Sequence, residues 1–134
     1  MIKVFFSYSE KERDKYSISK LAQLLESKPN IEIVYHWERD AKTSIIQYLD
    51  EKFPQSDICV FFYSSDSVSS DVERPEQKMA IFQAKHIIPV FMDPKDVPHI
   101  LRIQTGINAT NKTSEQILDG LYQLIVAKFD IKTQ

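Results

Sequence analysis

Glycine and cysteine are scarce in this sequence, which holds two glycines and one cysteine among 134 residues. Gly106 and Gly120 are too few and too far apart to build a Walker loop or the glycine-rich fingerprint of dinucleotide-binding folds. Cys59 has no second cysteine in the chain to pair with, and its place in an apolar run indicates a small core residue. This cysteine usage fits a reducing compartment.

Neither sign of charge is in excess, and long hydrophobic runs are missing. Lys and Arg number 17 against 19 Asp and Glu, with a net charge of −2 and no dense basic face. We therefore expect no nucleic-acid partner, because such binding needs many phosphate contacts. The apolar run at residues 2–6 is too short for a signal peptide, and no run approaches the roughly 20 apolar residues of a membrane span. The expected location is the cytoplasm, with no membrane partner.

Metal ligands are sparse as well. The three histidines lie far apart in the sequence without ligand spacing, and only one cysteine accompanies them. They are interpreted as surface or strand-end residues: His36, His86 and His99. The sequence predicts no metal site.

Apolar runs alternate with segments of helical periodicity, which is typical of βαβ units and a parallel sheet. The length and the 43% hydrophobic content suit one domain, residues 1–134, which can equally be a piece of a longer protein. The predicted strands cover residues 2–8, 31–35, 58–63, 86–92 and a short stretch within 103–108. Segment 58–63 is the most apolar and is expected at the sheet centre.

Helical spacing of apolar residues separates these strands. The predicted helices lie near residues 18–25, 46–53 and 75–84, with a last helix that begins at Thr113 or Ser114. The prediction is a three-layer α/β domain in which helices flank a central parallel sheet of about five strands. In such sheets ligands bind outside the carboxyl ends of the strands, so the loops that follow these ends are the candidate site.

Three segments resemble the Toll/interleukin-1 receptor (TIR) domains, particularly the prokaryotic ones, over nearly the whole chain. Residues 3–9 are similar to the first box of the family, where a strand ends in a polar pair, here Ser7 and Tyr8. Residues 58–65, with Ser70 and then Glu76 four residues ahead of Ala80, resemble its third strand, serine loop and helix. The apolar run 86–91, with a proline inside it, resembles its fourth strand. The resemblance implies a flavodoxin-like fold.

Many TIR domains cleave NAD+ into nicotinamide and ADP-ribose or a cyclised derivative, while others act only as scaffolds that recruit further TIR domains. The resemblance places the catalytic glutamate at Glu76, with Glu73 as the competitor if the alignment slips. It also implies prokaryotic immune signalling, including antiviral defence, with NAD+ as substrate rather than cofactor and other TIR domains as partners. A glutamate in the first turn of a helix is also favoured by the helix dipole alone.

Several residues at the expected carboxyl ends are candidates for substrate binding. Trp37 would stack on an adenine or nicotinamide ring, and Arg39 would meet the pyrophosphate. Equally, Trp37 would pack over the sheet edge and Arg39 would pair with neighbouring acids on a solvated surface. The hydroxyl candidates for the cleft are Ser7, Tyr8, Ser64, Ser65 and Ser70, although serines are also ordinary loop and capping residues.

The alternatives come from other functional classes. Val72 stands where many active TIR domains have tryptophan, and the loop after the second strand lacks its usual proline and glycine, which favours a non-catalytic scaffold. A response-regulator receiver is rejected, because Ser7, Tyr8 and Ser64 occupy the places of its acidic residues. An enzyme like the nucleoside deoxyribosyltransferases, which also break an N-ribosidic bond with a glutamate, stays as a weaker option.

Overall fold

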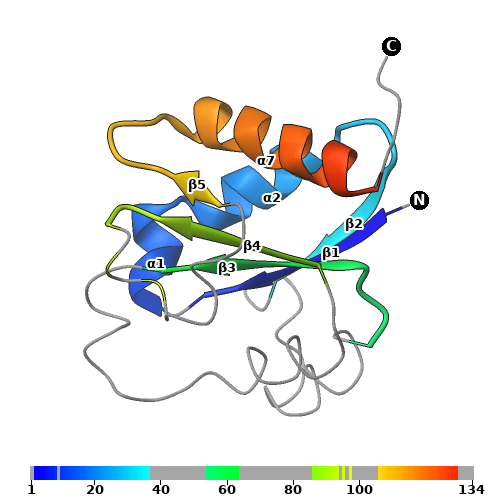
Figure 1. Cartoon of the computed structure of the whole chain (residues 1–134), viewed down its shortest axis with the longest axis horizontal. Helices are drawn as coiled ribbons and strands as arrows, with labels where there is room; N and C mark the ends of the chain where they lie inside the picture. The colour runs from blue at the N-terminus through cyan, green and yellow to red at the C-terminus, as the bar shows by residue number, and fades with distance from the viewer. Residues whose placement is uncertain are drawn as a thin grey trace.

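The computed structural model describes residues 2–8, 10–36, 54–63, 86–93, 95, 97 and 106–129. Within them, five strands and three helices form one α/β arrangement (Figure 1). The strands are β1 (Ile2–Ser7), β2 (Ile31–Tyr35), β3 (Ile58–Phe62), β4 (His86–Phe91) and β5 (Ile107–Asn108). The helices are α1 (Glu10–Lys15), α2 (Ile18–Glu26) and α7 (Ser114–Lys128).

All neighbouring strands are parallel, in the order β2-β1-β3-β4-β5. This is the strand order of flavodoxin-like folds, so the predicted fold class is confirmed. The central position of β3 is confirmed too, and all five of its residues are buried. We call the end of the sheet where the strands begin the amino edge, and the end where they finish the carboxyl edge.

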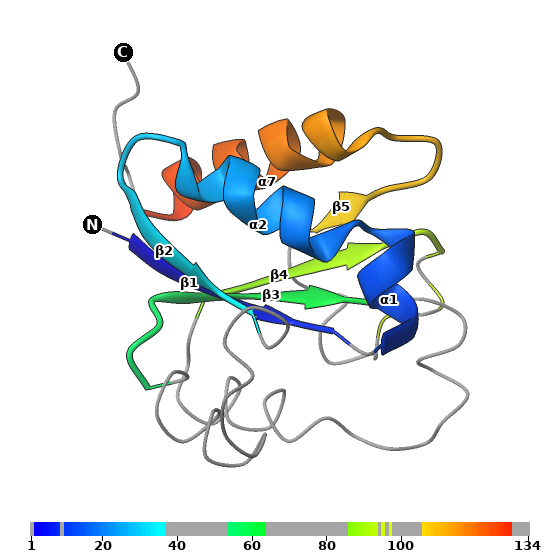
Figure 2. The same cartoon turned by 180° about the vertical axis from the view of Figure 1, so that it is seen from behind.

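Two helices cover one face of the sheet. Figures 1 and 2 show α2 and α7 side by side over this face, with α1 beside the carboxyl edge. The apolar residues that the sequence assigns to α2 are all buried: Ile18, Leu21, Ala22 and Leu25. Their side chains join those of Val4, Phe6, Val60 and Phe62 in the larger hydrophobic core. The helical periodicity therefore identified the core face of α2 correctly.

The opposite face of the sheet is also buried. Phe5, Tyr35, Cys59, Phe61 and Ile87 form a second hydrophobic cluster there, each at most 6% exposed. Burial on both faces explains why the strands are continuous apolar runs instead of alternating polar and apolar residues. The interpretation of Cys59 as a core thiol is confirmed, because its exposed fraction is 0%.

The last helix begins as the sequence predicts. Thr113 is its N-cap, and a capping box joins the Thr113 and Gln116 side chains to each other's backbone amides. An ion pair of 3.2 Å links Glu115 Oε1 to Lys20 Nζ of α2. The pKa of Glu115 is lowered because its own backbone amide donates to the carboxylate and because the Lys20 ammonium donates to it and attracts it. No described helix is long and apolar enough to span a membrane.

The pairing of β4 with β5 explains two unusual residues. The Val90 carbonyl accepts from the Tyr63 amide, and the Phe91 carbonyl accepts from the Ala109 amide. The backbone polar groups of successive β4 residues therefore point alternately toward the β3 side and the β5 side. Pro89 therefore faces β5, just before the ladder starts at Val90 and Ile107, where a missing amide costs least. A Cβ on Gly106 would lie 2.8 Å from Pro89 Cγ and closer still to the Pro89 carbonyl oxygen, so only glycine permits this approach.

The helix predicted near residues 18–25 is confirmed as α2, but the sequence did not predict a separate helix before it. The chain forms two helices, α1 and α2, separated at Tyr16 and Ser17. Ser17 has a left-handed backbone, with φ 49° and ψ 57°, and this breaks the helix without a glycine or proline. The helices predicted near residues 46–53 and 75–84 lie outside the described residues, as does segment 103–105 of the predicted fifth strand.

Candidate functional site

The carboxyl edge brings the ends of three adjacent strands together. β1 lies between β2 and β3, and its last residue, Ser7, is in register with Phe61 of β3. Because the first connection runs from β1 to one neighbour and the next strand pairs on the other side of β1, a topological switch point lies between β1 and β3. Ligand clefts of open parallel sheets form at such points.

Two of the predicted site residues lie at this edge, Ser7 and Tyr8. Ser7 is only 2% exposed, so its hydroxyl lies below the surface at the end of β1. Tyr8 is half-buried and packs against the hydrophobic core on the α2 face. Tyr8 therefore supports the end of β1, whether or not it also contacts a ligand.

The other candidates lie outside the described residues, in segments that leave from this edge. Trp37 and Arg39 follow His36 at the end of β2. The segment after Tyr63, at the end of β3, carries Glu76, the competing Glu73 and the serines Ser64, Ser65 and Ser70. The structure describes the points where these segments begin.

The starting point after β3 is held by two hydrogen bonds. The Tyr63 amide donates to the Val90 carbonyl at 2.9 Å, which continues the pairing with β4. The Tyr63 carbonyl accepts from the Tyr16 hydroxyl at 2.7 Å, in a buried contact between residues far apart in the sequence. The Tyr16 ring lies 5.2 Å from the ring of Phe62. The backbone amide and the backbone carbonyl of Tyr63 are therefore both held by hydrogen bonds.

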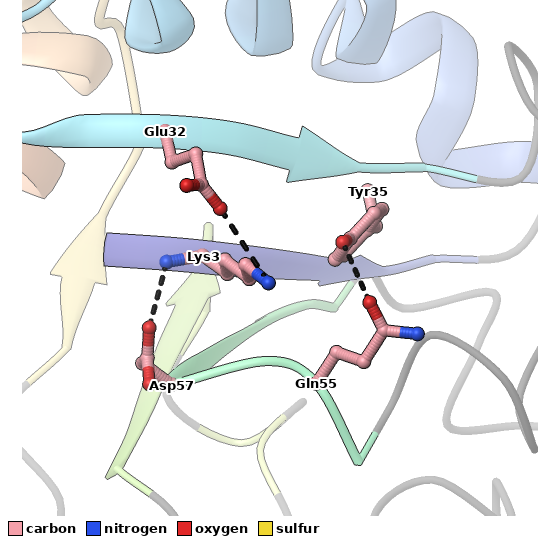
Figure 3. Close-up of polar contacts among 5 residues, drawn as sticks. All are labelled: Lys3, Glu32, Tyr35, Gln55 and Asp57. Atoms are coloured by element: carbon pink, nitrogen blue, oxygen red, sulfur yellow. Dashed lines mark hydrogen bonds and ion pairs between the residues drawn. The ribbon is translucent and has the colours of Figure 1, made fainter. Parts of the chain in front are cut away.

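A hydrogen bond joins the two ends of the segment between β2 and β3. The Tyr35 hydroxyl donates to Gln55 Oε1 at 3.3 Å, linking the residue before this segment to a residue after it (Figure 3). His36, which follows Tyr35, is 2% exposed. The strand-end position that the sequence assigns to this histidine is confirmed, although it is buried and not at the surface.

The remaining part of the carboxyl edge is tied by short turns. Asp93 Oδ1 accepts from the Lys95 amide at 3.0 Å, and Asn108 Oδ1 accepts from the Thr110 amide at the same distance. The Thr110 hydroxyl donates to the Met92 carbonyl at 2.7 Å, which connects the ends of β4 and β5. These polar side chains satisfy the backbone where the strands finish.

The amino edge has a different construction. The Lys3 amide donates to Asp57 Oδ2, and the Asp57 amide donates to the Lys3 carbonyl, both at 2.8 Å. Lys3 Nζ lies 3.5 Å from Glu32 Oε2, and Figure 3 shows Lys3 between Glu32 and Asp57. The register shift between Ile2 and Lys3 makes Glu32 the extra residue of a β-bulge, which directs its side chain toward Lys3.

Sequence reasoning missed Tyr16. It is 2% exposed although it lies outside the helical spacing of α2, only two residues before the buried Ile18. A large apolar residue out of phase with the next helix is a weak signal for a helix break. Its hydrogen bond to Tyr63 has no local signature at all, because the partner is a distant backbone carbonyl one residue beyond β3.

In the part of the chain that the structure describes, no group of His, Cys, Asp and Glu side chains is arranged to hold a metal ion. His36 follows β2 at the carboxyl edge, whereas His86 begins β4 at the amino edge and is exposed.

Comparison with known proteins gives one family. A model of the TIR domain matches residues 4–125, which is most of the chain. No protein of curated function matches it. The match runs from within β1 through most of α7 and includes every candidate site residue.

Proposed function

This chain belongs to the TIR domain family, and we propose that it cleaves the bond between nicotinamide and ribose in NAD+ at the carboxyl edge of its sheet. The observation that carries the proposal is the adjacency of β2, β1 and β3. The family includes NAD+-cleaving enzymes, and the segments with the candidate residues of this reaction begin next to one another at these three strand ends. We therefore expect candidate residues from separate parts of the sequence to line the same cleft.

Glu76 is the proposed catalytic residue. Nicotinamide leaves NAD+ as a neutral molecule from a cationic ring, so it needs no proton from a general acid, unlike the oxygen leaving groups of ordinary glycosides. Positive charge develops on the ribose as the bond breaks, and a carboxylate beside it stabilises this oxocarbenium-like state. One glutamate is therefore sufficient for the chemistry.

The other candidates would bind the substrate. Trp37 would stack on one of the two aromatic rings of NAD+, and Arg39 would meet the pyrophosphate with two hydrogen bonds. Ser64, Ser65 and Ser70 would bind ribose or phosphate oxygens. Because Ser7 is buried at the end of β1, its hydroxyl and that of Tyr8 would belong to the floor of the cleft.

The proposed products are nicotinamide and either ADP-ribose or a cyclic form of it, acting in prokaryotic immune signalling such as antiviral defence, in the cytoplasm. Water captures the ribose cation in the first case, and a nitrogen or hydroxyl of the same molecule in the second. Self-association with other TIR domains would complete or activate the site.

A scaffold without catalysis is the second candidate function. Val72 favours it, since a smaller side chain replaces the tryptophan that many active TIR domains have four residues before the glutamate. In this case the chain would act only by binding other TIR domains.

Nicotinamide release, followed by chromatography of the products, distinguishes the two candidates. The purified protein is assayed with NAD+ at high concentration and with a crowding agent, beside Glu76→Gln and the matched variant Glu73→Gln. The proposal predicts turnover by wild type and Glu73→Gln, and a loss of at least about 100-fold for Glu76→Gln.

Other outcomes change the assignment. Loss at Glu73→Gln alone would move the catalytic residue to Glu73. No turnover by the assembled wild type would leave the scaffold function. Cleavage of nucleosides instead of NAD+ would indicate the deoxyribosyltransferase-like alternative.

A further inference from the structure

The turn between α1 and α2 places a tyrosine beside the carboxyl edge. Ser17 adopts a left-handed backbone, with no hydrogen bond from its own side chain to cap α2. The break takes Tyr16 out of the helical spacing of α2 and buries it to 2% exposure. A non-glycine residue adopts this backbone only where the surroundings hold it there.

The Tyr16 ring packs against an aromatic side chain of β3, which in turn packs against one of β1. Its centroid lies 5.2 Å from that of Phe62 in β3, and Phe62 lies 5.0 Å from Phe6 in β1 with the rings edge to face. A side chain packed in this way has little freedom, so the position of its hydroxyl is set by the core.

The hydroxyl bonds to the backbone one residue beyond β3. It donates to the Tyr63 carbonyl at 2.7 Å, whereas the Tyr63 amide is engaged by Val90 of β4. The strand ends at Phe62, so the donor for this carbonyl comes from a side chain of a distant turn. Tyr16 therefore fixes the direction in which the chain leaves β3.

We propose that Tyr16 is a positioning residue, which sets the carboxyl end of β3 and through it the placement of Glu76. The second part rests on the proposed function, because Glu76 follows Tyr63 along the same connection. The Tyr16 hydroxyl donates to the Tyr63 carbonyl, so its proposed action is on the backbone after β3 and not on the substrate. Its removal therefore lowers the rate of the chemical step more than the affinity for NAD+, since a small displacement of a catalytic group is costly to rate.

The chain contains a matched control at the opposite edge. The Tyr122 hydroxyl of α7 donates to the Pro29 carbonyl at 2.9 Å, in the turn that precedes β2. Tyr122 is also buried, at 8% exposure. Tyr16→Phe and Tyr122→Phe each delete one hydroxyl that bonds to a backbone carbonyl, and they leave both rings in place.

The experiment measures kcat and KM for NAD+ in the wild type and in both variants, together with amide hydrogen exchange by NMR. For Tyr16→Phe we expect kcat to fall about tenfold to a hundredfold with KM changed less than about twofold. The Tyr63 amide should also exchange faster in this variant. Tyr122→Phe should leave kcat and Tyr63 exchange as in the wild type.

Equal losses of kcat in the two variants would overturn the proposal, because they would reflect general destabilisation. An unchanged kcat in Tyr16→Phe would overturn the link to Glu76. If the wild type does not cleave NAD+, the proposed function fails by itself, and Tyr63 exchange then decides the positioning role. Faster exchange in Tyr16→Phe alone supports that role, and unchanged exchange contradicts it.

Discussion

At the amino edge of the sheet, polar groups bond to one another, whereas at the carboxyl edge they hold the places where other segments begin. The Lys3 amide donates to the Asp57 carboxylate, the Asp57 amide donates to the Lys3 carbonyl, and Glu32 pairs with the Lys3 ammonium. At the carboxyl edge, Tyr16 holds the Tyr63 carbonyl. Polar groups at the amino edge thus connect the strands to one another, whereas the Tyr16 hydroxyl at the carboxyl edge holds the starting point of a connecting segment.

The difference follows from the topology. Parallel strands need crossover connections, and those that leave the carboxyl edge of β2 and β3 carry all the candidate residues except Ser7 and Tyr8. Polar bonds at the amino edge contribute to stability, while under the proposed function those at the carboxyl edge would also help to place Glu76. Variants at the two edges should therefore separate stability from activity.

The largest effect on stability should come from Gly106→Ala, which disturbs the support of β4 at the carboxyl edge. The new Cβ would collide with the Pro89 carbonyl and ring, so β5 must shift. We expect a loss of about 1–3 kcal/mol in the free energy of unfolding, measured by urea denaturation.

Gly120→Ala is its control. The added Cβ lies 3.3 Å from Ile107 Cδ1, the end of a flexible side chain, and alanine favours the helix by up to about 1 kcal/mol. We expect stability to be unchanged or raised. If both alanines cost the same, the close approach at Pro89 is not the reason for glycine at residue 106.

A smaller effect should follow from Asp57→Ala at the amino edge. The substitution leaves the Lys3 amide without its carboxylate acceptor. The expected loss is about 1 kcal/mol of unfolding free energy, seen as a lower urea midpoint with the same slope. Because this edge is distant from the proposed chemistry, NAD+ turnover per folded molecule should not change. A loss of turnover without a loss of stability would contradict the proposed difference between the two edges.

Ser17→Gly should stabilise the turn beside the carboxyl edge. The left-handed backbone at Ser17 costs a residue with a side chain about 1–2 kcal/mol, and glycine adopts it freely, although glycine also loses more entropy on folding. We expect a net gain of about 1 kcal/mol or less, measured as a higher melting temperature. A decrease would show that the serine side chain stabilises this turn.

The smallest effect should come from Glu115→Gln in the helix layer. The pKa of Glu115 is lowered in the folded protein by its backbone amide and by Lys20, so the carboxylate contributes stability above its ordinary pKa. That contribution disappears as the pH falls through the lowered pKa, and salt weakens it. The urea midpoints of the two proteins should therefore converge on acidification. A difference that grows toward acid pH would contradict this sign.

Much of the fold was predictable from local pattern. The residues of β2 match the prediction, and β1, β3 and β4 end one residue earlier than expected. These strands are buried on both faces, so their apolar runs stand out from the sequence. The start of the last helix was predictable as Thr113 or Ser114, because capping depends on neighbouring residues.

The break at Ser17 was not predictable in the same way. Serine is not a usual left-handed residue, and the hydrogen bond that accompanies the break joins Tyr16 to Tyr63, 47 positions away and just beyond β3. The burial of Ser7 and His36 depends likewise on neighbouring strands and not on local sequence. Trp37, Arg39, Glu76 and the loop serines remain predictions from resemblance, because they lie outside the described residues.

The most direct test of the division between the two edges is one measurement, nicotinamide release per folded molecule, made on Asp57→Ala and Glu76→Gln with the unfolding free energy of each. We predict that Asp57→Ala loses stability and keeps turnover, while Glu76→Gln keeps stability and loses turnover by at least about 100-fold. Turnover retained by Glu76→Gln, or lost in a stable Asp57→Ala, would contradict the account.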